Sequence, residues 1–414
     1  MQLMPEPVNV LYISYDGMTD PLGQSQVLPY LCALSVKGYK ITLLSCEKPS
    51  RFNQSKNIIE DICNQADINW QPIPYTTSPP VVSTIRDIYM LKKKARALHK
   101  RYHFKIVHCR SYISALIGLD MKHKFKTKFL FDMRGFWADE RVEGGLWNLQ
   151  NPLYNIIYKF FKKKEKQYFE QADQTISLTY LGKNEIHSWD NLKNQPIPIT
   201  IIPCCVDTDL FDPSKISQEQ KESLRKRLNI SASEPVLGYL GSIGTWYMLE
   251  EMLDFFKQLK NKYPNAKMLF VSPEPKEMVI NKAYSLDIDE SSIIITSAKR
   301  KEVPLYISIM NYSIFFIKPC FSKKASSPTK QGEIMSMGIP VICNAGIGDT
   351  GYVVEKYRSG IAIDNFTEEA YGRAIEDLTM RQFSRADIRQ GAINFYGLEK
   401  GVENYEAVYK LLSK

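Results

Sequence analysis

The chain has 414 residues, more than a single hydrophobic core usually organises, so two domains of about 200 residues are expected. Its 44% hydrophobic and 24% charged residues are ordinary for a globular protein, and no apolar run approaches the roughly 18–20 residues of a membrane span. Residues 1–7 lack a basic segment followed by an apolar one, so no secretory signal is expected. The eight cysteines are scattered without a CxxC pair, which predicts free thiols in a reducing cytoplasm.

The net charge is +9, and the main basic runs all lie in the first half of the chain, at residues 92–101, 122–128 and 159–166. The third run follows an aromatic and apolar segment with helical spacing at 153–161. This pairing resembles an interfacial amphipathic helix, so the inner face of an anionic membrane is a candidate partner. A helix packed on the core with a solvated lysine face is the alternative. Nucleic acid is not expected, because the chain has no zinc-finger spacing and no RRM signature.

In the first half, short apolar segments alternate with helical patterns. Residues 8–14 predict the first strand, and a polar loop follows at 15–24. Ser25 is expected to cap the next helix, in which leucines fall at helical spacing and which ends at Gly38. Later strands are predicted at 41–44, 106–108, 129–132, 175–178 and 199–202. Strands separated by helical segments predict an α/β fold with a parallel, doubly wound sheet.

The same alternation restarts in the second half. A strand is predicted at 236–240, a glycine turn at 241–244 and a helix at 246–262. Further strands are predicted at 267–271, 292–296, 313–317, 341–343 and 360–363. With the boundary region near 204–214, the predicted domains are residues 1–204, residues 205–394 and a C-terminal helical segment at 395–414.

The most informative stretch of the chain is residues 327–342. It predicts a loop, a short helix at 330–337 and a glycine turn into a buried strand. Hydroxyl groups and an ammonium gather at the N-terminus of this helix, on Ser326, Thr329 and Lys330. Free backbone N–H groups and the helix dipole favour a bound phosphate there. Glu333 is expected on the first turn, where its carboxylate can accept hydrogen bonds from ribose hydroxyls. The stretch therefore predicts a nucleotide site, with an ordinary capped helix as the alternative.

Four polar loops leave the carboxyl ends of predicted strands, where open α/β sheets bind ligands. They are residues 16–24, 132–139, 241–245 and 326–333. Two domains of this kind are expected to direct these ends toward one cleft. Convergence of four independent loops predicts a ligand site more strongly than any one loop does.

Three segments resemble the retaining GT-B glycosyltransferases of family 4, the bacterial polysaccharide type of group 1. Residues 13–30 resemble the acceptor-side glycine loop, 202–211 the domain-junction motif, and 333–342 the segment after the second glutamate of a paired-glutamate motif. The resemblance implies two Rossmann-like domains facing a central cleft. The first is expected to bind the acceptor and the second the nucleotide sugar, and the last helix is expected to cross back onto the first domain.

The resemblance also implies a reaction. A sugar passes from a nucleotide-diphosphate sugar to a hydroxyl, with retention, in cell-surface polysaccharide or lipid-linked glycan synthesis. The acceptor is expected to be a polyprenyl-phosphate-linked or other glycan, and neither a cofactor nor a metal is expected. The alternative is a non-catalytic homologue that binds nucleotide or scaffolds a partner. A dinucleotide-dependent oxidoreductase is disfavoured, because no Gly-x-Gly-x-x-Gly turn follows the first strand.

Three sets of site residues follow from these patterns. The expected donor-binding residues are Gly241, Ser242, Gly244, Thr245, Lys318, Ser326, Thr329, Lys330 and Glu333. The expected acceptor-binding residues are Asp16, Gly17, Asp20, Gly23 and Gln24. The expected catalytic groups are Arg134, Asp139 and Lys330, and a structural ion pair is the alternative for the first two.

The chain departs from the family pattern at three positions. Ala325 stands where the first glutamate of the pair would contact the sugar. Ser242 stands where an arginine would clamp the diphosphate, and Arg134 aligns with an active-site histidine. Either Lys330, with Lys318, restores the missing positive charge, or catalysis is weak or absent. The hydroxyls and lysine of the 326–333 loop favour a rebuilt clamp.

Two Asp-x-Asp pairs match the pattern by which another glycosyltransferase fold holds a divalent ion. They are Asp207 with Asp209, and Asp287 with Asp289. Such pairs arise often by chance, and Asp207 is better interpreted as the cap of a turn. No metal site is therefore expected.

Overall fold

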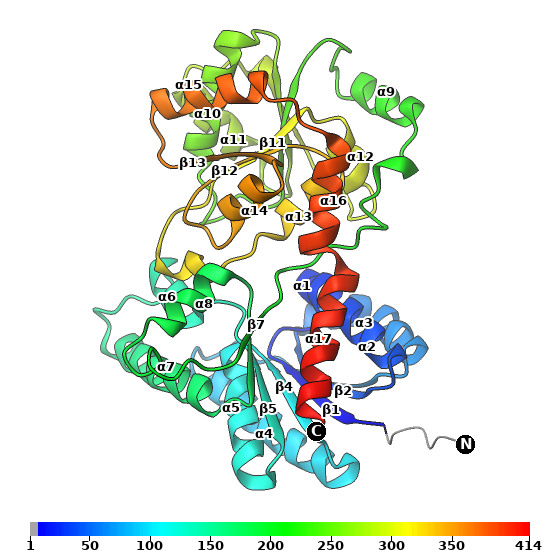
Figure 1. Ribbon diagram of the computed structural model, residues 1–414, viewed down its shortest axis with the longest axis vertical. Coiled ribbons are helices and arrows are strands. Elements are labelled where there is room, and N and C mark those ends of the chain that lie inside the picture. Colours follow the sequence, from blue (N-terminus) through cyan, green and yellow to red (C-terminus); the bar gives the residue numbers. More distant parts are fainter. Residues whose placement is uncertain (1–6) are drawn as a thin grey trace. The chain divides into compact units, whose positions relative to one another are not determined.

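The computed structural model describes residues 7–414, and their contacts divide the chain into two compact units (Figure 1). The first unit holds the chain up to Pro203 together with Gly401–Lys414, and the second holds Cys204–Lys400. The expectation about a secretory signal concerns residues 1–7 and falls almost entirely outside the described residues. Within residues 7–414, no helix combines the length and the apolar character that crossing a membrane requires.

Among the described residues of the first unit, seven parallel strands form a sheet in the order β3-β2-β1-β4-β5-β6-β7. The strands are β1 (Asn9–Ser14), β2 (Lys40–Glu47), β3 (Asn69–Pro74), β4 (Ile106–Arg110), β5 (Lys128–Asp132), β6 (Gln174–Ser177) and β7 (Ile199–Ile201). The parallel sheet expected from the sequence is confirmed. Strand β3 is not predicted from the sequence, because its prolines interrupt the strand pattern. Proline is tolerated here because β3 is an edge strand.

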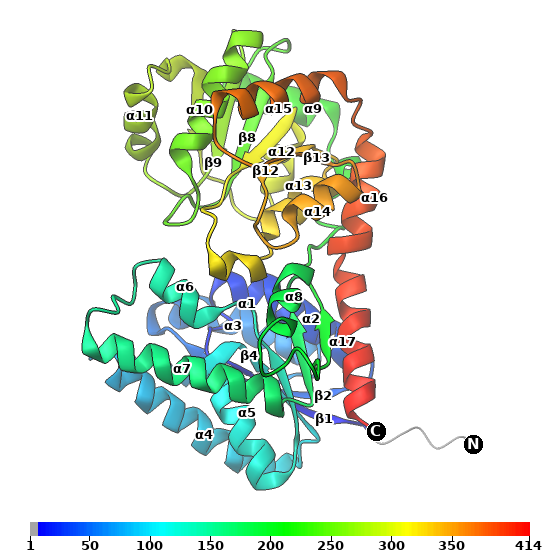
Figure 2. The ribbon, with the colours of Figure 1, turned by 60° about the vertical axis from the view of Figure 1, so that its left-hand side comes forward.

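Helices cover both faces of this sheet. They are α1 (Pro21–Gln26), α2 (Leu28–Val36), α3 (Pro49–Gln65), α4 (Val82–Tyr102), α5 (Ser111–Phe125), α6 (Trp137–Glu143), α7 (Pro152–Gln171), α8 (Tyr180–His187) and most of α17 (Leu398–Leu412). Figure 2 shows α4, α5 and α7 side by side on one face, with α2 and α17 on the other. Tyr405 of α17 donates a hydrogen bond to Asp132 Oδ2 at 3.0 Å, which ties this helix to the end of β5.

Ser25 does not cap a helix, so that expectation is wrong. Pro21 starts α1 earlier, since its fixed φ suits the first helical position. Ser25 then lies inside α1, where its hydroxyl donates to the Pro21 carbonyl at 2.8 Å. The chain bends at Val27 before α2 begins. Gly38, with a φ of +93°, follows the end of α2 as expected.

The second unit, which is described throughout, contains six parallel strands in the order β10-β9-β8-β11-β12-β13. They are β8 (Val236–Leu240), β9 (Lys267–Val271), β10 (Ile293–Thr296), β11 (Tyr312–Phe315), β12 (Val341–Asn344) and β13 (Gly360–Ile363). The helices are α9 (Gln218–Arg227), α10 (Leu249–Lys262), α11 (Lys276–Ser285), α12 (Val303–Ser308), α13 (Thr329–Ser336), α14 (Thr350–Lys356), α15 (Glu368–Met380) and α16 (Arg385–Tyr396). Short 3₁₀ helices are η1 (Pro213–Lys215), η2 (Glu290–Ser292) and η3 (Phe321–Ala325). The second doubly wound sheet is confirmed.

The helix expected at 246–262 begins three residues late, at Leu249. Tyr247 forms an antiparallel bridge with Ile317, and the Met248 N–H donates to the Phe316 carbonyl at 3.0 Å. These bonds hold the segment extended beside the end of β11. The segment that follows the glycine turn is therefore fixed against the sheet.

Candidate active site

A glycine turn follows β8 at the carboxyl edge of the second sheet. Gly241 and Gly244 have φ angles of +98° and +51°, which glycine adopts without strain. Ser242 and Thr245 are exposed, so the turn offers hydroxyl groups at its surface. The predicted turn is confirmed, and its contact with a diphosphate stays a prediction.

Lys330 of α13 faces this turn. A side-chain carbon on Gly241 would lie 3.5 Å from Lys330 Nζ. The ammonium donates to the Tyr239 hydroxyl at 3.0 Å and lies 3.5 Å from the centre of the Tyr247 ring. Burial lowers the pKa of Lys330 well below its usual value, and Glu333 opposes this only in part. Because no carboxylate of the described residues lies within ion-pair distance of Nζ, a bound anion would supply the missing counter-charge.

Glu333 is the fifth residue of α13, so the expectation that it lies on the first turn is wrong. It is buried, with 7% of its surface exposed, and Oε1 accepts a hydrogen bond from Arg300 Nη1 at 2.8 Å. Burial raises the pKa of this carboxyl group, although the Arg300 charge works in the opposite direction. The carboxylate is thus held at the carboxyl edge of the sheet by a half-exposed arginine, and its role toward ribose stays a prediction.

The other predicted donor residues surround the start of α13 and the end of β11. Thr329 is the first residue of α13, and Ser326 follows η3. Ser327 accepts a hydrogen bond from the Cys204 N–H at 3.1 Å, which fixes the loop between η3 and α13. Lys318 is exposed, and its backbone N–H donates to the Trp246 carbonyl at 2.9 Å. The second unit therefore brings together all predicted donor residues except Lys318 around the turn and α13; Lys318 lies next to Trp246.

In the first unit, the predicted acceptor loop is held by Glu47, the last residue of β2. The Glu47 carboxylate accepts hydrogen bonds from the backbone N–H of Met18 at 2.8 Å and of Thr19 at 3.1 Å. A side-chain carbon on Gly17 would lie 2.6 Å from Glu47 Oε2, and one on Gly23 would lie 2.3 Å from the Gly17 carbonyl oxygen. Both glycines are therefore required for close packing of the loop.

The polar side chains of this loop differ in what they contact. Asp20 forms ion pairs with Lys48 at 2.9 Å and Arg51 at 2.8 Å. Gln24 Nε2 donates to the Thr19 carbonyl at 3.2 Å. Asp16 is exposed, with 52% of its side chain in contact with water. Asp16 is thus the predicted acceptor residue whose carboxylate is most accessible, and the acceptor roles stay predictions.

Arg134 lies at the end of β5, where its φ of +57° is uncommon for a non-glycine residue. Its Nη1 lies 3.9 Å from Asp132 Oδ1, and His108 Nε2 lies 3.6 Å from Asp132 Oδ2. Burial opposes ionisation of Asp132, but Arg134, His108 and Arg110 outweigh it, so the Asp132 pKa lies below its usual value. Burial lowers the pKa of His108. A buried carboxylate thus orients the arginine that aligns with the family's histidine.

Asp139 is bound on both oxygens by residues of α7. Tyr158 donates to Oδ1 and Lys162 to Oδ2, each at 2.8 Å. These bonds fasten α6 to α7. Asp139 therefore forms a structural ion pair with Lys162, as the alternative interpretation expects. Its catalytic role stays a prediction.

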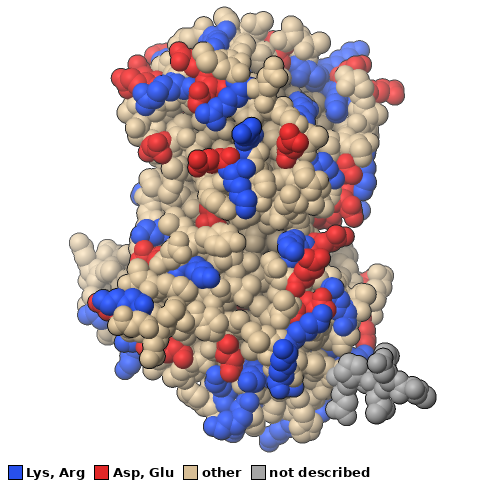
Figure 3. Space-filling view, in the orientation of Figure 1, with Lys and Arg blue, Asp and Glu red and all other residues tan. Residues whose placement is uncertain are grey.

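The basic runs are partly neutralised within the first unit. Lys92 and Arg96 pair with Asp120, each at 2.7 Å, and Lys122 pairs with Asp173 at 2.8 Å. Figure 3 shows basic and acidic side chains interspersed over the face that it displays. The net charge is therefore not gathered into one continuous basic surface on that face.

The amphipathic segment expected at 153–161 lies in α7. One side of this helix packs on the core through Phe161, Tyr168 and Phe169. The other leaves Ile156 and Phe160 66% and 44% exposed. The helix is thus both packed on the core and apolar on its exposed side, and membrane association stays a prediction.

The Asp-x-Asp pairs serve as caps of turns. Asp207 Oδ1 accepts hydrogen bonds from the N–H groups of Asp209 and Leu210 at 3.0 and 2.9 Å, as expected for a turn cap. Asp289 accepts from Ser291 in the same way. Over residues 7–414, no group of three or more histidine, cysteine, aspartate or glutamate side chains is arranged to hold a metal ion. All eight cysteines are free thiols.

Each half of the chain matches the model of a known protein family. The model described as Glycosyltransferase Family 4 matches residues 26–210, and the model described as Glycosyl transferases group 1 matches residues 220–395. The chain belongs to glycosyltransferase family 4, group 1. Its two parallel-sheet units have the GT-B architecture, as the resemblance in sequence implies.

Individual relatives are distant in sequence. The alpha-monoglucosyldiacylglycerol synthase of Acholeplasma laidlawii is 25% identical over 195 residues, a match that spans 45% of this chain and 45% of that protein. A sucrose-phosphate synthase of Thermosynechococcus elongatus is similar in structure, with a TM-score of 0.72 at 15% identity, over 98% of this chain and 99% of that one. The Anabaena protein HepE, solved in complex with UDP-glucose, gives a TM-score of 0.69 at 13% identity, over 98% and 100%. Similarity at this level of identity supports the fold.

Ala325 stands where the sequence resemblance implies a glutamate. Ala325 is fully buried in η3, so its methyl group offers no polar contact where the family pattern has a glutamate. Two residues earlier, Lys323 places its ammonium 3.6 Å from the centre of the Trp246 ring. A second lysine thus lies beside the segment that follows the glycine turn. Its ammonium thus lies next to the turn where Ser242 replaces the expected arginine.

Three residues of the two sites escape sequence reasoning: Glu47, Arg300 and Lys323. Glu47 and Arg300 follow or end apolar strands, at the carboxyl edges where ligand sites lie. Lys323 belongs to a basic pair, Lys323 and Lys324, just before the loop at 326–333. The signal for all three is therefore a charged residue next to a predicted strand end or site loop.

Proposed function

We propose that this protein transfers a sugar from a nucleotide-diphosphate sugar to a hydroxyl group, with retention of the anomeric configuration. The second unit binds the donor and the first binds the acceptor. The observation that carries the proposal is the buried ammonium of Lys330 beside the Gly241 turn, without a carboxylate at ion-pair distance among the described residues. Membership of family 4 supports the same reaction class.

The proposed chemistry needs stabilisation of the departing diphosphate. The bond from the anomeric carbon to the diphosphate oxygen breaks, and a bond to the acceptor oxygen forms on the same face. The acceptor proton passes to the departing phosphate, so no side-chain base is required. Negative charge grows on the diphosphate, and donors fixed in advance contribute most to the rate. Lys330, the hydroxyls of Ser242 and Thr245, and Lys323 beside Trp246 are placed to supply this charge stabilisation.

We propose that the transfer is independent of metal, because ammonium groups, rather than a carboxylate cluster, lie beside the glycine turn. Uridine diphosphate hexoses are the first donors to test, since HepE is solved with UDP-glucose. Glu333 is the proposed ribose contact, held by Arg300.

The proposed acceptor is a lipid-linked glycan or another lipid acceptor at the inner face of the membrane, in surface polysaccharide or glycolipid synthesis. The partial match to a monoglucosyldiacylglycerol synthase supports a lipid acceptor. The exposed apolar side of α7, with lysines along the same helix, supports a protein that is peripheral to the membrane.

The test combines a binding screen with turnover. Purified protein is heated with each of several nucleotide sugars, and a rise in melting temperature identifies the donor. That donor is then incubated with polyprenyl-phosphate-linked sugars in detergent, and NMR of the product reports the anomeric configuration. Sugar transfer with retention is expected. An inverted product, or no melting shift and no transfer with any nucleotide sugar, overturns the proposal.

A non-catalytic homologue is the second candidate, and the buried methyl group of Ala325 favours it. This candidate predicts a melting shift with nucleotides but neither transfer nor slow hydrolysis of any nucleotide sugar. Ala325→Glu discriminates further. A gain of turnover in that variant would show that the missing carboxylate limits the wild-type protein.

A further inference from the structure

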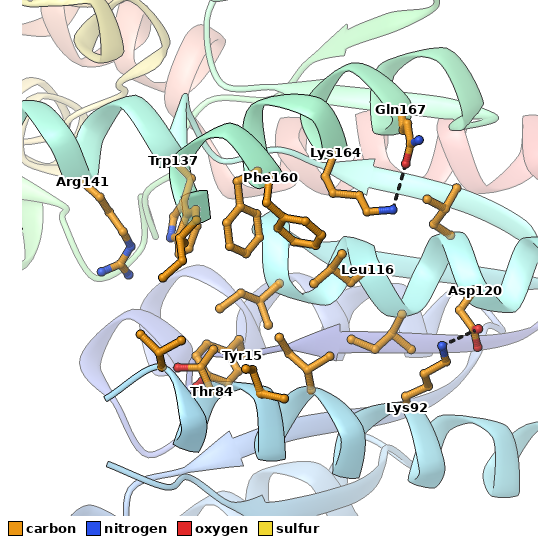
Figure 4. A pocket seen from close by; sticks show the side chains of 18 of the residues that line it. Tyr15, Thr84, Lys92, Leu116, Asp120, Trp137, Arg141, Phe160, Lys164 and Gln167 are labelled. Carbon is orange, nitrogen blue, oxygen red and sulfur yellow. Dashed lines mark hydrogen bonds and ion pairs between the residues drawn. The ribbon is translucent and has the colours of Figure 1, made fainter. Parts of the chain in front are cut away.

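A cavity of about 900 Å³ opens between α4, α5 and α7 of the first unit. Pockets that bind small organic molecules measure about 300–1,000 Å³, so this one can hold a sizeable ligand. Figure 4 shows α5 along its floor, with α4 and α7 on either side. None of the predicted donor or acceptor residues lines it. The groove therefore needs an explanation of its own.

Apolar side chains line the middle of the groove on all three helices. They include Ile85 and Ile88 of α4, Leu116 and Ile117 of α5, and Ile157 and Phe160 of α7. Ile85 and Phe160 are 61% and 44% exposed. Contiguous apolar surface of this kind marks binding sites on soluble proteins. The middle of the groove thus suits a hydrocarbon ligand.

One end of the groove carries a cation without an ion pair at close range within residues 7–414, although the carboxylates of Glu140 and Asp16 interact with it electrostatically. Arg141 lies there with Tyr15 and Trp137 (Figure 4). Its guanidinium lies 4.4 Å from the centre of the Trp137 ring and 5.8 Å from that of Trp147. Its Nε–H is buried without a hydrogen-bond partner, and among the described residues no carboxylate forms an ion pair with it. An anion at this end would satisfy both the charge and the N–H group.

The other end of the groove has polar groups that satisfy one another. Lys92 pairs with Asp120 at 2.7 Å, and Lys164 donates to Gln167 at 2.9 Å, as the dashed lines in Figure 4 show. The two ends of the groove therefore differ in hydrogen bonding: the Arg141 end holds a buried N–H without a partner among the described residues, whereas Lys92 and Lys164 at the far end each have one, of which only Asp120 is a carboxylate. Together with the apolar middle, this difference matches a molecule with one anionic head and one hydrocarbon chain.

We propose that this groove binds the hydrocarbon chain of the lipid acceptor, with the lipid phosphate held by Arg141. The inference rests on the proposed function, because it names the chemical class of the acceptor. Tyr15 at the Arg141 end directly precedes Asp16 of the predicted acceptor loop. A phosphate on Arg141 therefore places the head of the lipid beside that loop, where the hydroxyl to be glycosylated must lie.

The experiment uses the full-length protein and n-dodecyl phosphate below its micelle concentration, titrated by calorimetry. Dodecanol and inorganic phosphate serve as partial probes. Dodecyl phosphate is expected to bind about tenfold or more tightly than dodecanol, because an arginine–phosphate contact adds a charge-assisted hydrogen bond. Inorganic phosphate is expected to bind far more weakly than either. Equal affinity of dodecanol and dodecyl phosphate would overturn the assignment of the phosphate to Arg141.

Two variants locate the binding. Arg141→Gln is expected to weaken dodecyl phosphate about tenfold and to leave dodecanol unchanged. Leu116→Trp fills the middle of the groove and is expected to weaken both. Arg86→Gln, on the exposed side of α4 outside the groove, is the matched control and should change neither. Thermal unfolding checks that each variant is folded. Unchanged binding in folded Leu116→Trp would overturn the proposal.

Other occupants give different results. A dimer that dissociates in the exposed variant Ile156→Glu, with no binding of dodecyl phosphate, would assign the groove to a second copy and refute the proposal. Failure of the proposed function is separately visible. A protein that binds dodecyl phosphate in the groove but transfers no sugar would refute the function and support the groove as a lipid site. Sugar transfer by the wild-type protein, together with equal affinity of wild type and Leu116→Trp for dodecyl phosphate, would refute the groove as a lipid site and leave the proposed function intact.

Discussion

The ammonium of Lys330 donates a hydrogen bond to the hydroxyl of Tyr239 at 3.0 Å, and that hydroxyl in turn donates to the Ser242 carbonyl at 2.6 Å. Lys330 is thus connected to the residue that replaces the arginine of the family's diphosphate clamp. The rings of Tyr239 and Tyr247 attract the cation without neutralising it. Its positive charge therefore remains available to an anion at the Gly241 turn.

Replacing Lys330 should lower turnover more than it weakens nucleotide binding. Lys330→Met keeps most of the buried volume and removes the charge, and since the diphosphate gains charge in the transition state, kcat should fall by about 100-fold or more. Steady-state kinetics and calorimetry with the free nucleoside diphosphate separate the two effects. Lys276→Met, an exposed lysine of α11, is the matched control. Unchanged kcat in Lys330→Met, with a loss in Lys318→Met, would assign the clamp to Lys318.

Nucleotide binding should take up protons and weaken as the pH rises. Burial lowers the pKa of Lys330 well below its usual value, so Lys330 of the free protein gives up its proton more readily than an exposed lysine does. A diphosphate beside the amine favours its charged form, which raises the pKa in the complex and draws in a proton. Phosphate groups, with a second pKa near 6, are already ionised above about pH 7 and do not contribute there. Calorimetry in buffers of different ionisation enthalpy measures the uptake, which Lys330→Met should abolish. Equal uptake in that variant would assign the proton to another group.

Regular structure follows from the sequence wherever apolar residues alternate with clear turn signals. The strands β1 and β8 and the turn at Gly241 are of this kind. The start of α10 is not predictable in this way, because hydrogen bonds to the end of β11 hold Tyr247 and Met248 extended. Long-range pairing overrides local helical preference there.

The sequence predicts only those parts of the site in which a residue interacts with its neighbours along the chain. The pairing of Arg300 with Glu333 joins α13 to the loop after β10, and no local pattern links the two. Glu47 binds the backbone of Met18 and Thr19 across the gap between two strands that are adjacent in the sheet. Charged residues at the carboxyl ends of strands can therefore be predicted from the sequence, whereas the residues that they contact can be identified only from the structure.

Activity should persist in the presence of EDTA. The proposed charge stabilisation comes from Lys330 and Lys323, and Asp207 is occupied in capping a turn. Sugar transfer measured in the presence of EDTA should match that of untreated protein. Loss of activity in EDTA, with recovery on addition of Mn²⁺, would contradict this expectation.

Binding to anionic vesicles should depend on salt and on the exposed lysines of α7. Lys159, Lys163 and Lys166 are exposed, and each basic residue near an anionic surface contributes about 1 kcal/mol. The triple change of these residues to Gln should therefore reduce co-sedimentation with phosphatidylglycerol vesicles strongly at low salt. The matched control changes exposed lysines of the second unit to Gln, namely Lys226, Lys262 and Lys276. Equal sedimentation with neutral and anionic vesicles, insensitive to salt, would count against the electrostatic contribution.

Glu333→Gln should weaken nucleotide binding by about two or more powers of ten. A carboxylate can accept hydrogen bonds from both ribose hydroxyls, each worth about 1.5–3 kcal/mol, and 1.4 kcal/mol is about one power of ten in affinity. The ribose is remote from the reacting carbon, so the loss should appear first in calorimetric affinity for the nucleoside diphosphate and only secondarily in kcat.

The same change also removes the ion pair with Arg300, so Arg300→Gln is the control that breaks the pair and keeps the carboxylate. Arg300 is half-exposed and can be hydrated after the change, so Arg300→Gln should weaken binding less than Glu333→Gln does. A nucleoside diphosphate without its ribose hydroxyls separates the two roles of the carboxylate. It should bind wild type about as weakly as the natural nucleotide binds Glu333→Gln, and it should lose nothing further in that variant. If Glu333 only positions Arg300, both variants will weaken binding equally. The difference in affinity between the natural and the modified nucleotide will then be the same in wild type, Glu333→Gln and Arg300→Gln. That result, or wild-type affinity in folded Glu333→Gln, would remove the ribose assignment.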